Sequence, residues 1–372
     1  MLLSNLRSLV RLPPPIKNNS IQSATFKQFI ATMSTEHKHT DGSTKWSSND
    51  GRFRRQESSF RNFITKEGES EFKPELNRYH LICALACPWA HRSMIVRQLK
   101  GIDKVQGLLP LHTVDSLLGP EGWSFVPYDS PEELKGLGIP GTGLKIKGHE
   151  NKKRIRELYL TANPDYKDRC TVPIIWDNKL NTIVNNESSE IIRMLNTCFD
   201  DFIDEKYRGL TFYPEEDKNI QKQIDELNEW IYPNINNGVY KSGFATKQDA
   251  YQESVKPLFD HLDKVEKILN HGRNYLVGNR LTEADIRLFT TIIRFDPVYV
   301  GHFKCNIKTI RDGYPNIHKW VRQLYWKEGA GAFKDTTEFE SIKAHYYQSH
   351  PQINPTRIIP AGPHPYILPL DE

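Results

Sequence analysis

The hydrophobic positions of this chain change their spacing near residue 215, from short apolar runs to a helical period. The first part holds four apolar runs bounded by turn-forming residues, a pattern typical of β-strands. These runs span residues 79–85, 105–111, 171–176 and 182–184. Residues 91–100 carry a helical pattern that ends at Gly101, and a second helix is expected over residues 187–196.

Helical spacing dominates the second part of the chain. Apolar side chains recur every three or four positions within residues 220–231 and again within residues 258–269. Thr282 is followed three residues later by Asp285, so we expect a helix to begin there, with Thr282 as N-cap and Asp285 at N3. The predicted fold is therefore an α/β unit, β-α-β, a long connection and β-β-α, followed by an all-α half.

Three segments fit neither pattern. Residues 36–75 are polar and predict an irregular, loosely packed N-terminal extension. Residues 113–162 are rich in Gly and Pro without a clear period, so they predict a long insertion. Residues 349–372 are rich in proline and predict an extended tail. The two domains are accordingly expected at residues 76–200 and 215–348.

The net charge of +4 has its origin in the first 35 of the 372 residues, which hold four basic side chains and no acid. Removing those four from the 50 basic residues leaves 46, which equals the 46 acidic residues. An acid-free start with several leucines resembles a mitochondrial transit peptide. A disordered tail is the alternative, and Met33 offers a second start that omits this stretch. Residues 1–35 are therefore a candidate targeting leader, and we expect a cytoplasmic or mitochondrial protein.

Composition narrows the partners further. The chain is 38% hydrophobic and 26% charged, which is ordinary for a globular protein. No apolar run approaches the roughly 18 residues that a spanning helix needs, and no basic block indicates nucleic acid or a membrane surface. Five scattered cysteines are not a disulfide framework and fit a reducing compartment. We expect no metal site and no permanently bound cofactor.

Cys87 is the first candidate for chemistry, because it stands between a strand-like run and a helix in the stretch YHLICALACPWAHR. The first N–H groups of a helix lack partners and favour a negative charge, and Pro88 suits the first helical position. We therefore expect Cys87 to be an N-cap thiol with a lowered pKa. The alternative is a buried structural cysteine, which is the preferred interpretation for Cys83 within the strand.

The residue three positions after Cys87 is Ala90, where a dithiol oxidoreductase would carry its resolving cysteine. Cys87 therefore cannot close a local disulfide of its own. If it attacks a sulfur atom, an external thiol must release it. This pattern indicates a monothiol mechanism with a small thiol as cosubstrate.

Two more stretches suit a peptide-like ligand. Thr171-Val172-Pro173 places a proline at a strand start, and the free backbone of Val172 could pair with an added strand. Glu187 and Ser188 stand at a strand-to-helix junction, where a helix N-terminus binds a carboxylate and Glu187 accepts from an ammonium. A plain strand start and ordinary helix capping are the alternatives.

Together these stretches resemble the glutathione transferase fold, and more narrowly the glutathionyl-hydroquinone reductases of its Xi class, which are related to the omega class. The narrower resemblance covers most of residues 79–363. It rests on eight strings in order: ACPWAHR at 86–92, GWSF at 122–125, RCTVPIIWD at 169–177, NNESSEIIRMLN at 185–196, NNGVYKSGFA at 236–245, LTEADIRLF at 281–289, RFDPVYVGHFKCN at 294–306 and INPTRIIPAGP at 353–363.

The resemblance implies a thioredoxin-like N-terminal domain, an all-α C-terminal domain with the substrate side of the site, and a homodimer. It implies Cys87 as nucleophile and Tyr240 as the proton donor and acceptor at the substrate ring. Two further hydroxyls, of Tyr299 and Tyr346, would help to keep the cysteine a thiolate. Glutathione contacts are implied for Trp123, Arg169, Cys170, Thr171, Val172, Glu187 and Ser188. Cys170 stands where a Val is common, which should not impair backbone contacts.

The activity implied by the resemblance is reduction of a glutathionyl-hydroquinone through a mixed disulfide of Cys87, with glutathione as cosubstrate and a glutathionylated aromatic compound as substrate. An omega-like thioltransferase or dehydroascorbate reductase is the alternative, since it shares Cys87 but does not need Tyr240. A non-catalytic binding module of the same fold is a third interpretation, which the intact cysteine site opposes.

Overall fold

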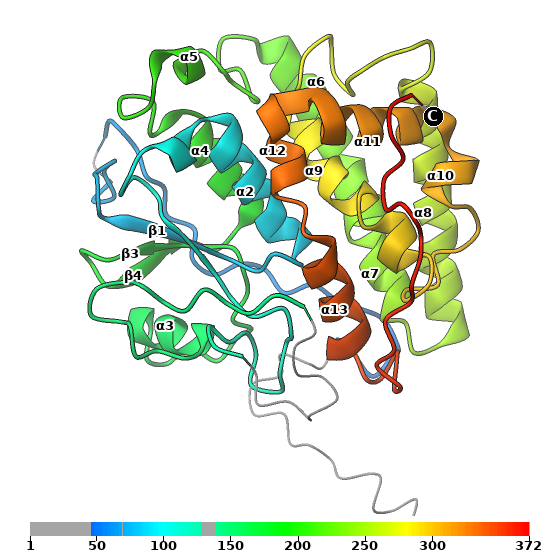
Figure 1. Ribbon diagram of the computed structural model, residues 1–372, viewed down its shortest axis with the longest axis horizontal. Helices are drawn as coiled ribbons and strands as arrows, with labels where there is room; N and C mark the ends of the chain where they lie inside the picture. Colours follow the sequence, from blue (N-terminus) through cyan, green and yellow to red (C-terminus); the bar gives the residue numbers. More distant parts are fainter. Residues whose placement is uncertain (1–45, 69, 128–137, 372) are drawn as a thin grey trace, which may run out of the picture. The chain divides into compact units, whose positions relative to one another are not determined.

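The computed structural model describes residues 46–68, 70–127 and 138–371 (Figure 1). The candidate leader, residues 1–35, lies outside these described residues, as does part of the predicted insertion, residues 128–137. All of the described residues fall within one compact unit. The domain boundary expected between residues 200 and 215 therefore stays a prediction.

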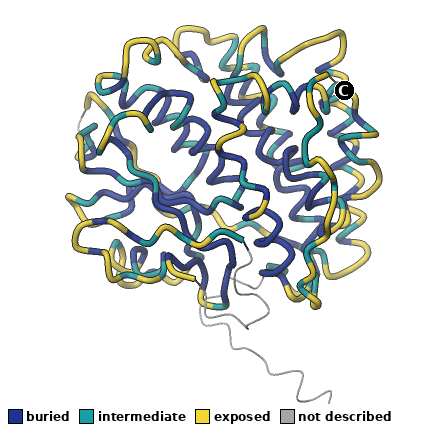
Figure 2. Tube along the Cα trace, viewed as in Figure 1, coloured by how far each residue is buried: buried dark blue, intermediate teal, exposed yellow. Residues whose placement is uncertain are grey.

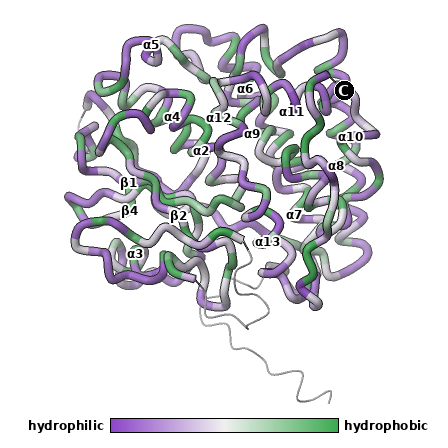
Figure 3. Tube along the Cα trace, in the orientation of Figure 1, coloured by the Kyte–Doolittle hydropathy of each residue, from purple (hydrophilic) through white to green (hydrophobic). Residues whose placement is uncertain are grey.

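A four-stranded mixed sheet organises the first half of the described chain. Its strands are β1 (Tyr79–Cys83), β2 (Leu111–Thr113), β3 (Ile174–Asp177) and β4 (Thr182–Asn185). The spatial order is β2-β1-β3-β4, with β1 parallel to β2 and antiparallel to β3, and with β3 antiparallel to β4. The strands are largely hydrophobic (Figure 3), because this sheet is covered on both faces and its residues are mostly buried.

Three helices cover the sheet. Helices α2 (Pro88–Leu99) and α4 (Ser188–Thr197) pack against each other on one face, while α3 (Ile155–Ala162) lies on the other face against β4 (Figure 1). A short 3₁₀ turn, η1 (Ile102–Lys104), follows α2. This arrangement confirms the predicted thioredoxin-like unit.

The second half is helical, as predicted. Its α-helices are α5 (Glu205–Arg208), α6 (Lys218–Ile231), α7 (Gly238–Gly243), α8 (Gln248–Ile268), α9 (Glu283–Ile292), α10 (Ile310–Gly313), α11 (Pro315–Lys327), α12 (Ala332–Asp335) and α13 (Phe339–Ser349). Two π-helical turns, η3 (Tyr232–Asn236) and η4 (Phe295–Tyr299), and one 3₁₀ turn, η5 (Glu328–Gly331), separate some of them. The capping box is confirmed, since the Thr282 N–H donates to the Asp285 carboxylate over 3.0 Å.

Helix α2 joins the two halves because it packs against α4 on one side and against α9 on the other. Both α2 and α9 are buried along most of their length (Figure 2). Even the polar side chains of His91, Arg92 and Ser93 are buried. A cysteine placed just before α2 is therefore held by both halves of the molecule.

Two elements differ from the sequence-based expectation. The strand expected at residues 105–111 is wrong, because the chain turns between Val105 and Leu108, with a left-handed Gly107, and pairing begins only at Leu111. The predicted insertion also contains helix α3, which the sequence analysis missed. Its start is fixed by Glu157, whose carboxylate accepts from the N–H groups of Lys153 and Arg154 over 3.0 and 2.9 Å.

The N-terminal extension is irregular, as expected, but it is not loosely packed. Phe53, Ile64 and Phe72 are buried in the main hydrophobic core. Residues 46–64 are here called the strap. Within the strap, Ser47 forms an isolated β-bridge with Phe53, and Arg61 forms another with Asn185 of β4. The C-terminal tail has neither helix nor strand over residues 351–371 but contains turns, so its extended form stays a prediction.

Among the described residues, no helix is long and apolar enough to cross a membrane. Within the same ranges, no group of three or more His, Cys, Asp or Glu side chains is arranged to hold a metal ion.

Candidate active site

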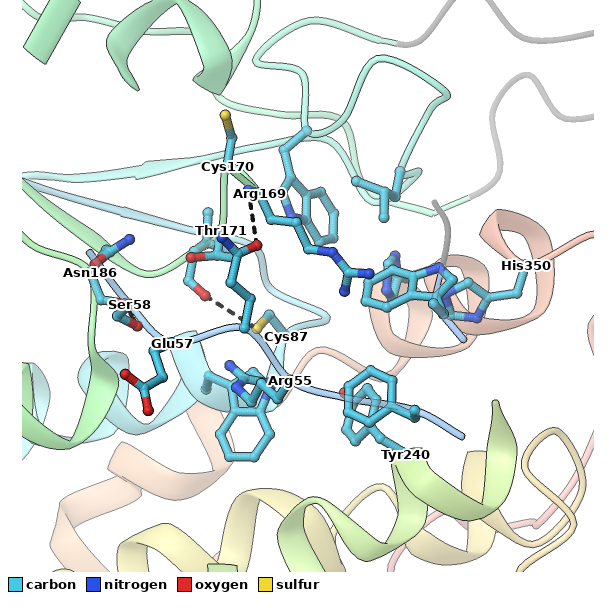
Figure 4. A pocket seen from close by; sticks show the side chains of 18 of the residues that line it. Arg55, Glu57, Ser58, Cys87, Arg169, Cys170, Thr171, Asn186, Tyr240 and His350 are labelled. Carbon is cyan, nitrogen blue, oxygen red and sulfur yellow. Dashed lines mark hydrogen bonds between the residues drawn. The ribbon is translucent and has the colours of Figure 1, made fainter. Parts of the chain in front are cut away.

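A pocket lies where the strap, the start of α2, the segment before β3, helix α7 and helix α13 meet (Figure 4). Most of the residues that the sequence analysis singled out line it, namely Cys87, Trp123, Arg169, Cys170, Thr171, Val172, Tyr240 and Tyr346. Tyr299, Glu187 and Ser188 do not line the pocket. Tyr299 bonds to Tyr346 and Glu187 bonds to Ser58, and both of these partners line it. Ser188 accepts from Arg92 of α2.

Cys87 occupies the N-cap position of α2, with Pro88 as the first helical residue, as expected. The side chain is half-buried, whereas the other four cysteines, Cys83 among them, are buried, and all five are free thiols. The Cys87 thiol donates to the carbonyl oxygen of Val172 at 3.7 Å (Figure 4). The Val172–Pro173 peptide bond is cis, and the residue that accepts from Cys87 directly precedes this proline.

The expected lowered pKa of Cys87 is wrong for this geometry. Burial raises the pKa of the thiol, and this effect exceeds the opposing influence of the Ala90 and Trp89 N–H groups and of the positive charges of Arg55 and Arg294. The helix N-terminus acts in the predicted direction, but how deeply the site is covered cannot be read from a local sequence pattern. The positive charges that favour ionisation of this thiol, those of Arg55 and Arg294, come from outside α2.

Arg294 fixes the loop before Cys87 to the helical half. Its guanidinium is fully buried and donates to the carbonyl oxygens of Ala86 and Thr290 at 2.9 and 2.8 Å, and to that of Leu85 at 3.3 Å. It also contacts the imidazole of His91 at 3.0 Å. The sequence analysis included Arg294 in a family string but gave it no role.

The three candidate tyrosines form one hydrogen-bonded group. The hydroxyl of Tyr346 bonds to that of Tyr240 and, at 3.1 Å, to that of Tyr299. Within the part of the chain that the structure describes, none of the three donates a hydrogen bond to Cys87. Burial raises the pKa of all three hydroxyls. Their support of a thiolate therefore stays a prediction, while their common placement beside the pocket is clear.

Glu187 is the N-cap of α4, which agrees with the capping alternative. Its carboxylate accepts from the Ser189 N–H at 3.1 Å and from the hydroxyl of Ser58 at 3.1 Å. Burial would raise its pKa, but these bonds and the positive charges of Arg55 and Arg92 prevail, so the pKa of Glu187 is lowered. The carboxylate therefore remains charged at neutral pH, as binding of an ammonium group requires.

The remaining predicted contacts surround the mouth of the pocket. The Trp123 ring stacks on His345 at 4.9 Å, and the Arg169 guanidinium lies over the Trp46 ring at 5.0 Å. The Cys170 thiol is buried next to Arg156, at 3.9 Å. The backbone of Thr171 bonds through both its N–H and its carbonyl oxygen to the hydroxyl of Tyr159.

The sequence analysis missed every pocket residue that the strap contributes. These residues are Trp46, Phe53, Arg55, Gln56, Glu57 and Ser58. It also gave no role to His345 and His350 of the α13 region, which line the same pocket. The only available signal was the mixture of arginine and phenylalanine at residues 52–63, which is unusual for a solvated extension.

Comparison with known proteins agrees with this geometry. The family model described as Glutathione S-transferase, N-terminal domain, matches residues 86–198, and the model described as Glutathione S-transferase, C-terminal domain, matches residues 248–323. The chain is 50% identical to Glutathione S-transferase omega-like 2 of Schizosaccharomyces pombe over 87% of this chain and 97% of that protein. It is 46% identical to Glutathionyl-hydroquinone reductase YqjG of Escherichia coli over 84% of this chain and 89% of that protein.

A solved structure extends the likeness to three dimensions. The Xi glutathione transferase ECM4 from Saccharomyces cerevisiae, in complex with glutathione, superposes with a TM-score of 0.77 at 45% identity, covering 85% of this chain and all of that one. The fold and the cysteine site thus define a glutathione-dependent enzyme. The chain belongs to the glutathione transferase family, in its Xi class.

Proposed function

We propose that the chain reduces glutathionyl-hydroquinones to hydroquinones, with glutathione as the reductant and glutathione disulfide as the second product. The observation that carries the proposal is that Cys87, a thiol without a resolving partner at Ala90, shares one pocket with Tyr240. The names of the relatives support the same substrate class, since YqjG is called a glutathionyl-hydroquinone reductase.

The proposed reaction has two steps. The Cys87 thiolate attacks the glutathione sulfur of the substrate, so a sulfur–sulfur bond forms and the aryl carbon–sulfur bond breaks. The electron pair of the broken bond goes to the ring carbon, which takes a proton from Tyr240. A second glutathione gives its thiol proton back to Tyr240. Its thiolate then attacks the glutathione sulfur of the mixed disulfide, so that glutathione disulfide leaves and the Cys87 thiolate is restored.

Glutathione is proposed to lie along the segment before β3. Among the described residues, no hydrogen bond to the Val172 N–H is present, so this group is available to a peptide ligand. The charged Glu187 and the hydroxyl of Ser188 at the α4 N-terminus suit the α-amino acid end of the tripeptide. Trp123 and Arg169 would close the site on the opposite side.

The proposal is tested by replacing the proposed nucleophile, Cys87. Cys87→Ser should abolish turnover of a panel of glutathionyl aromatics with glutathione as reductant, because a serine hydroxyl cannot form the mixed disulfide. Mass spectrometry should show a glutathione adduct on the wild type and none at this position in the variant. Full reductase turnover by Cys87→Ser would refute the proposed mechanism.

A thioltransferase or dehydroascorbate reductase is the second candidate, since a close relative carries an omega-like name. Such an activity needs Cys87 and glutathione but no proton donor for an aromatic ring. Tyr240 therefore separates the two candidates. The homodimer and the cytoplasmic or mitochondrial localisation stay predictions.

A further inference from the structure

The strap connects the two halves of the molecule and passes along the pocket. At one end, Arg52 pairs with Glu253 of α8 at 2.7 Å, and Ser47 donates to the carbonyl oxygen of Phe244 after α7. At the other end, Arg61 pairs with Glu190 of α4, and Ser58 donates to the Glu187 carboxylate. The family model of the N-terminal domain begins at residue 86, so the strap lies outside the part that this model matches.

Arg55 differs from the other arginines of the strap. Arg52, Arg54 and Arg61 are each paired with a carboxylate, of Glu253, Asp50 and Glu190 respectively. Within the described ranges, no carboxylate lies at ion-pair distance from Arg55. Its guanidinium instead lies over the Trp89 ring, 4.1 Å from the ring centre, and it lines the same pocket as Cys87 (Figure 4).

The charged and titratable groups that face Cys87 come from five parts of the chain. They are Arg55 of the strap, Cys83 of β1, Tyr240 of α7, Arg294 after α9 and Tyr299 of η4. Cys83 and the two tyrosines are neutral at neutral pH, since burial raises the pKa of each. Arg294 already donates to three carbonyl oxygens. Arg55 is thus the cation at this thiol whose donors are not committed elsewhere among the described residues.

The position of Trp89 explains how the long side chain of Arg55 is held in place. Trp89 is the second residue of α2, two positions after Cys87, and its ring is buried. Stacking of a guanidinium on an indole face is attractive and fixes the plane of the charge. Arg92 also lies over this ring, at 4.6 Å. The same indole therefore holds Arg55 beside the N-terminus of α2.

We infer that Arg55 is a further active-site residue, whose guanidinium, delivered by the strap, stabilises the thiolate of Cys87. This inference rests on the proposed role of Cys87 as the nucleophile. When Cys87 gives up its proton to solvent, the resulting negative charge has Arg55 as its counter-ion at the pocket wall. The strap is then a third component of the active site, besides the thioredoxin-like and helical parts.

The experiment measures the thiolate directly. The rate of Cys87 alkylation by iodoacetamide is followed by intact mass from pH 5 to pH 10, with Cys87→Ser as the blank for the four buried cysteines. Three variants of the full chain are compared with the wild type, namely Arg55→Gln, Arg55→Lys and Arg54→Gln. Arg54 is the matched control, because it neighbours Arg55 but is exposed and paired with Asp50.

Arg55→Gln should slow alkylation at pH 7 about tenfold and move the whole profile to higher pH, with the same plateau at alkaline pH. Arg55→Lys should lie between Arg55→Gln and the wild type, since it keeps the charge but loses the planar stack. Arg54→Gln should superpose on the wild type. These outcomes would support the inference.

Two outcomes would overturn the inference. An Arg55→Gln profile that superposes on the wild type would show that Arg55 does not act on the thiolate. A weakened affinity for glutathione in that variant would then assign Arg55 to glutathione binding, directly or through the charge of Glu187. An alkylation rate lowered by the same factor at every pH, including the alkaline plateau, would indicate a changed shape of the site rather than the loss of a charge. Neither outcome depends on hydroquinone turnover. Failure of this inference can therefore be distinguished from failure of the proposed function, which a fully active Cys87→Ser variant would show.

Discussion

A buried hydroxyl can act as an acid only while it keeps its proton, and Tyr240 meets that condition. Burial raises its pKa well above the ordinary value for tyrosine, so the hydroxyl is protonated at neutral pH. The hydrogen bond to Tyr346 fixes the direction of its oxygen. Phe303, whose ring centre is 5.4 Å away, and the other surrounding rings hold the phenol itself. Its position would survive the loss of the oxygen atom.

Tyr240→Phe should therefore separate the two candidate activities. Reductive cleavage of an aryl carbon–sulfur bond needs a proton on the ring, so glutathionyl-hydroquinone reduction should fall by roughly 10²-fold or more. Cleavage of a small disulfide needs no such proton, so turnover of the mixed disulfide of glutathione and hydroxyethyl thiol should be largely kept. A parallel loss of both activities would assign Tyr240 to the thiolate or the fold, and no loss would favour the thioltransferase.

Glu187 combines capping and charge, and one substitution separates them. Glu187→Gln keeps an oxygen that can accept from the Ser189 N–H but loses the negative charge. We expect glutathione affinity, measured by calorimetry, to fall by about tenfold, with little change in thermal midpoint. Glu187→Ala should also lose about 1 kcal/mol of stability, because the α4 cap is removed.

Glu190 provides the matched control for this experiment, because it lies on the same helix but is paired with Arg61 of the strap. Glu190→Gln should leave glutathione affinity unchanged. Unchanged affinity in Glu187→Gln as well would move the binding site of the α-amino group to another acid, with Glu57 of the strap as the next candidate in the pocket.

Single residues differ in how far the sequence could assign them. Cys87 was identifiable because its place between a strand and Pro88 is a local pattern. Arg55 was not, because its role depends on a ring and a thiol that lie more than thirty positions further along the chain. The pKa of Cys87 was misjudged for a related reason, since burial is a property of the assembled pocket.

Among the elements, α9 owes its start to a buried carboxylate that senses pH. Asp285 accepts from the Thr282 N–H, the Leu276 N–H and the indole N–H of Trp320. Burial nevertheless raises its pKa to about 6. The ordinary value for aspartate is about 3.9, so between these values the folded protein binds a proton that the unfolded chain does not. The stability from this group is present below the lower value and is lost as pH rises through about 6.

Asp285→Asn should remove this titration. The variant will be less stable at both pH values, because the amide can accept at only one oxygen. Between pH 7 and pH 5, the wild type should gain about 1 kcal/mol of unfolding free energy relative to the variant. Urea titrations of both proteins at the two pH values measure the difference, and parallel pH dependences would contradict the assignment.

The elements that the sequence predicted well are those with local signals. The capping box at Thr282 and the apolar run of β1 are of this kind. By contrast, the apolar side chains of Leu108 and Leu109 suggested a strand, although they are buried from a turn. Helix α3 was hidden because it is short and follows a long stretch rich in glycine and proline, where no period can build up.

At the scale of the whole molecule, buried polar bonds tie the two halves into one cooperative unit. Arg294 of the helical half donates to Ala86 and Leu85 beside the cysteine, and Arg92 of α2 donates to the carbonyl oxygen of Arg287 at 3.3 Å. Unfolding of one half would leave these groups buried without partners in the other. The wild type should therefore unfold in one transition.

Arg294→Met should lower the unfolding free energy by about 3–5 kcal/mol, because the carbonyl oxygens it serves lose their donor. Urea unfolding followed in parallel by circular dichroism and by Cys87 alkylation would measure the loss of unfolding free energy. Separation of the two unfolding curves would show that the two halves no longer unfold together. Arg280→Met is the control, since Arg280 is exposed and, among the described residues, bonds only to the Thr211 carbonyl oxygen. A cost below about 1 kcal/mol for Arg294→Met would contradict this role.

The strap also sets the order in which the pocket can be completed during synthesis. Trp46 packs on Phe244 and on His350, with ring centres 4.8 and 5.8 Å apart. A ribosome makes the first of these residues some three hundred positions before the last, at about 5–20 residues per second. The contact of Trp46 with His350 can therefore form only some tens of seconds after Trp46 is made, once α13 has left the exit tunnel. A nascent chain can have its thioredoxin-like unit formed and its cysteine in place while one wall of the pocket is still missing.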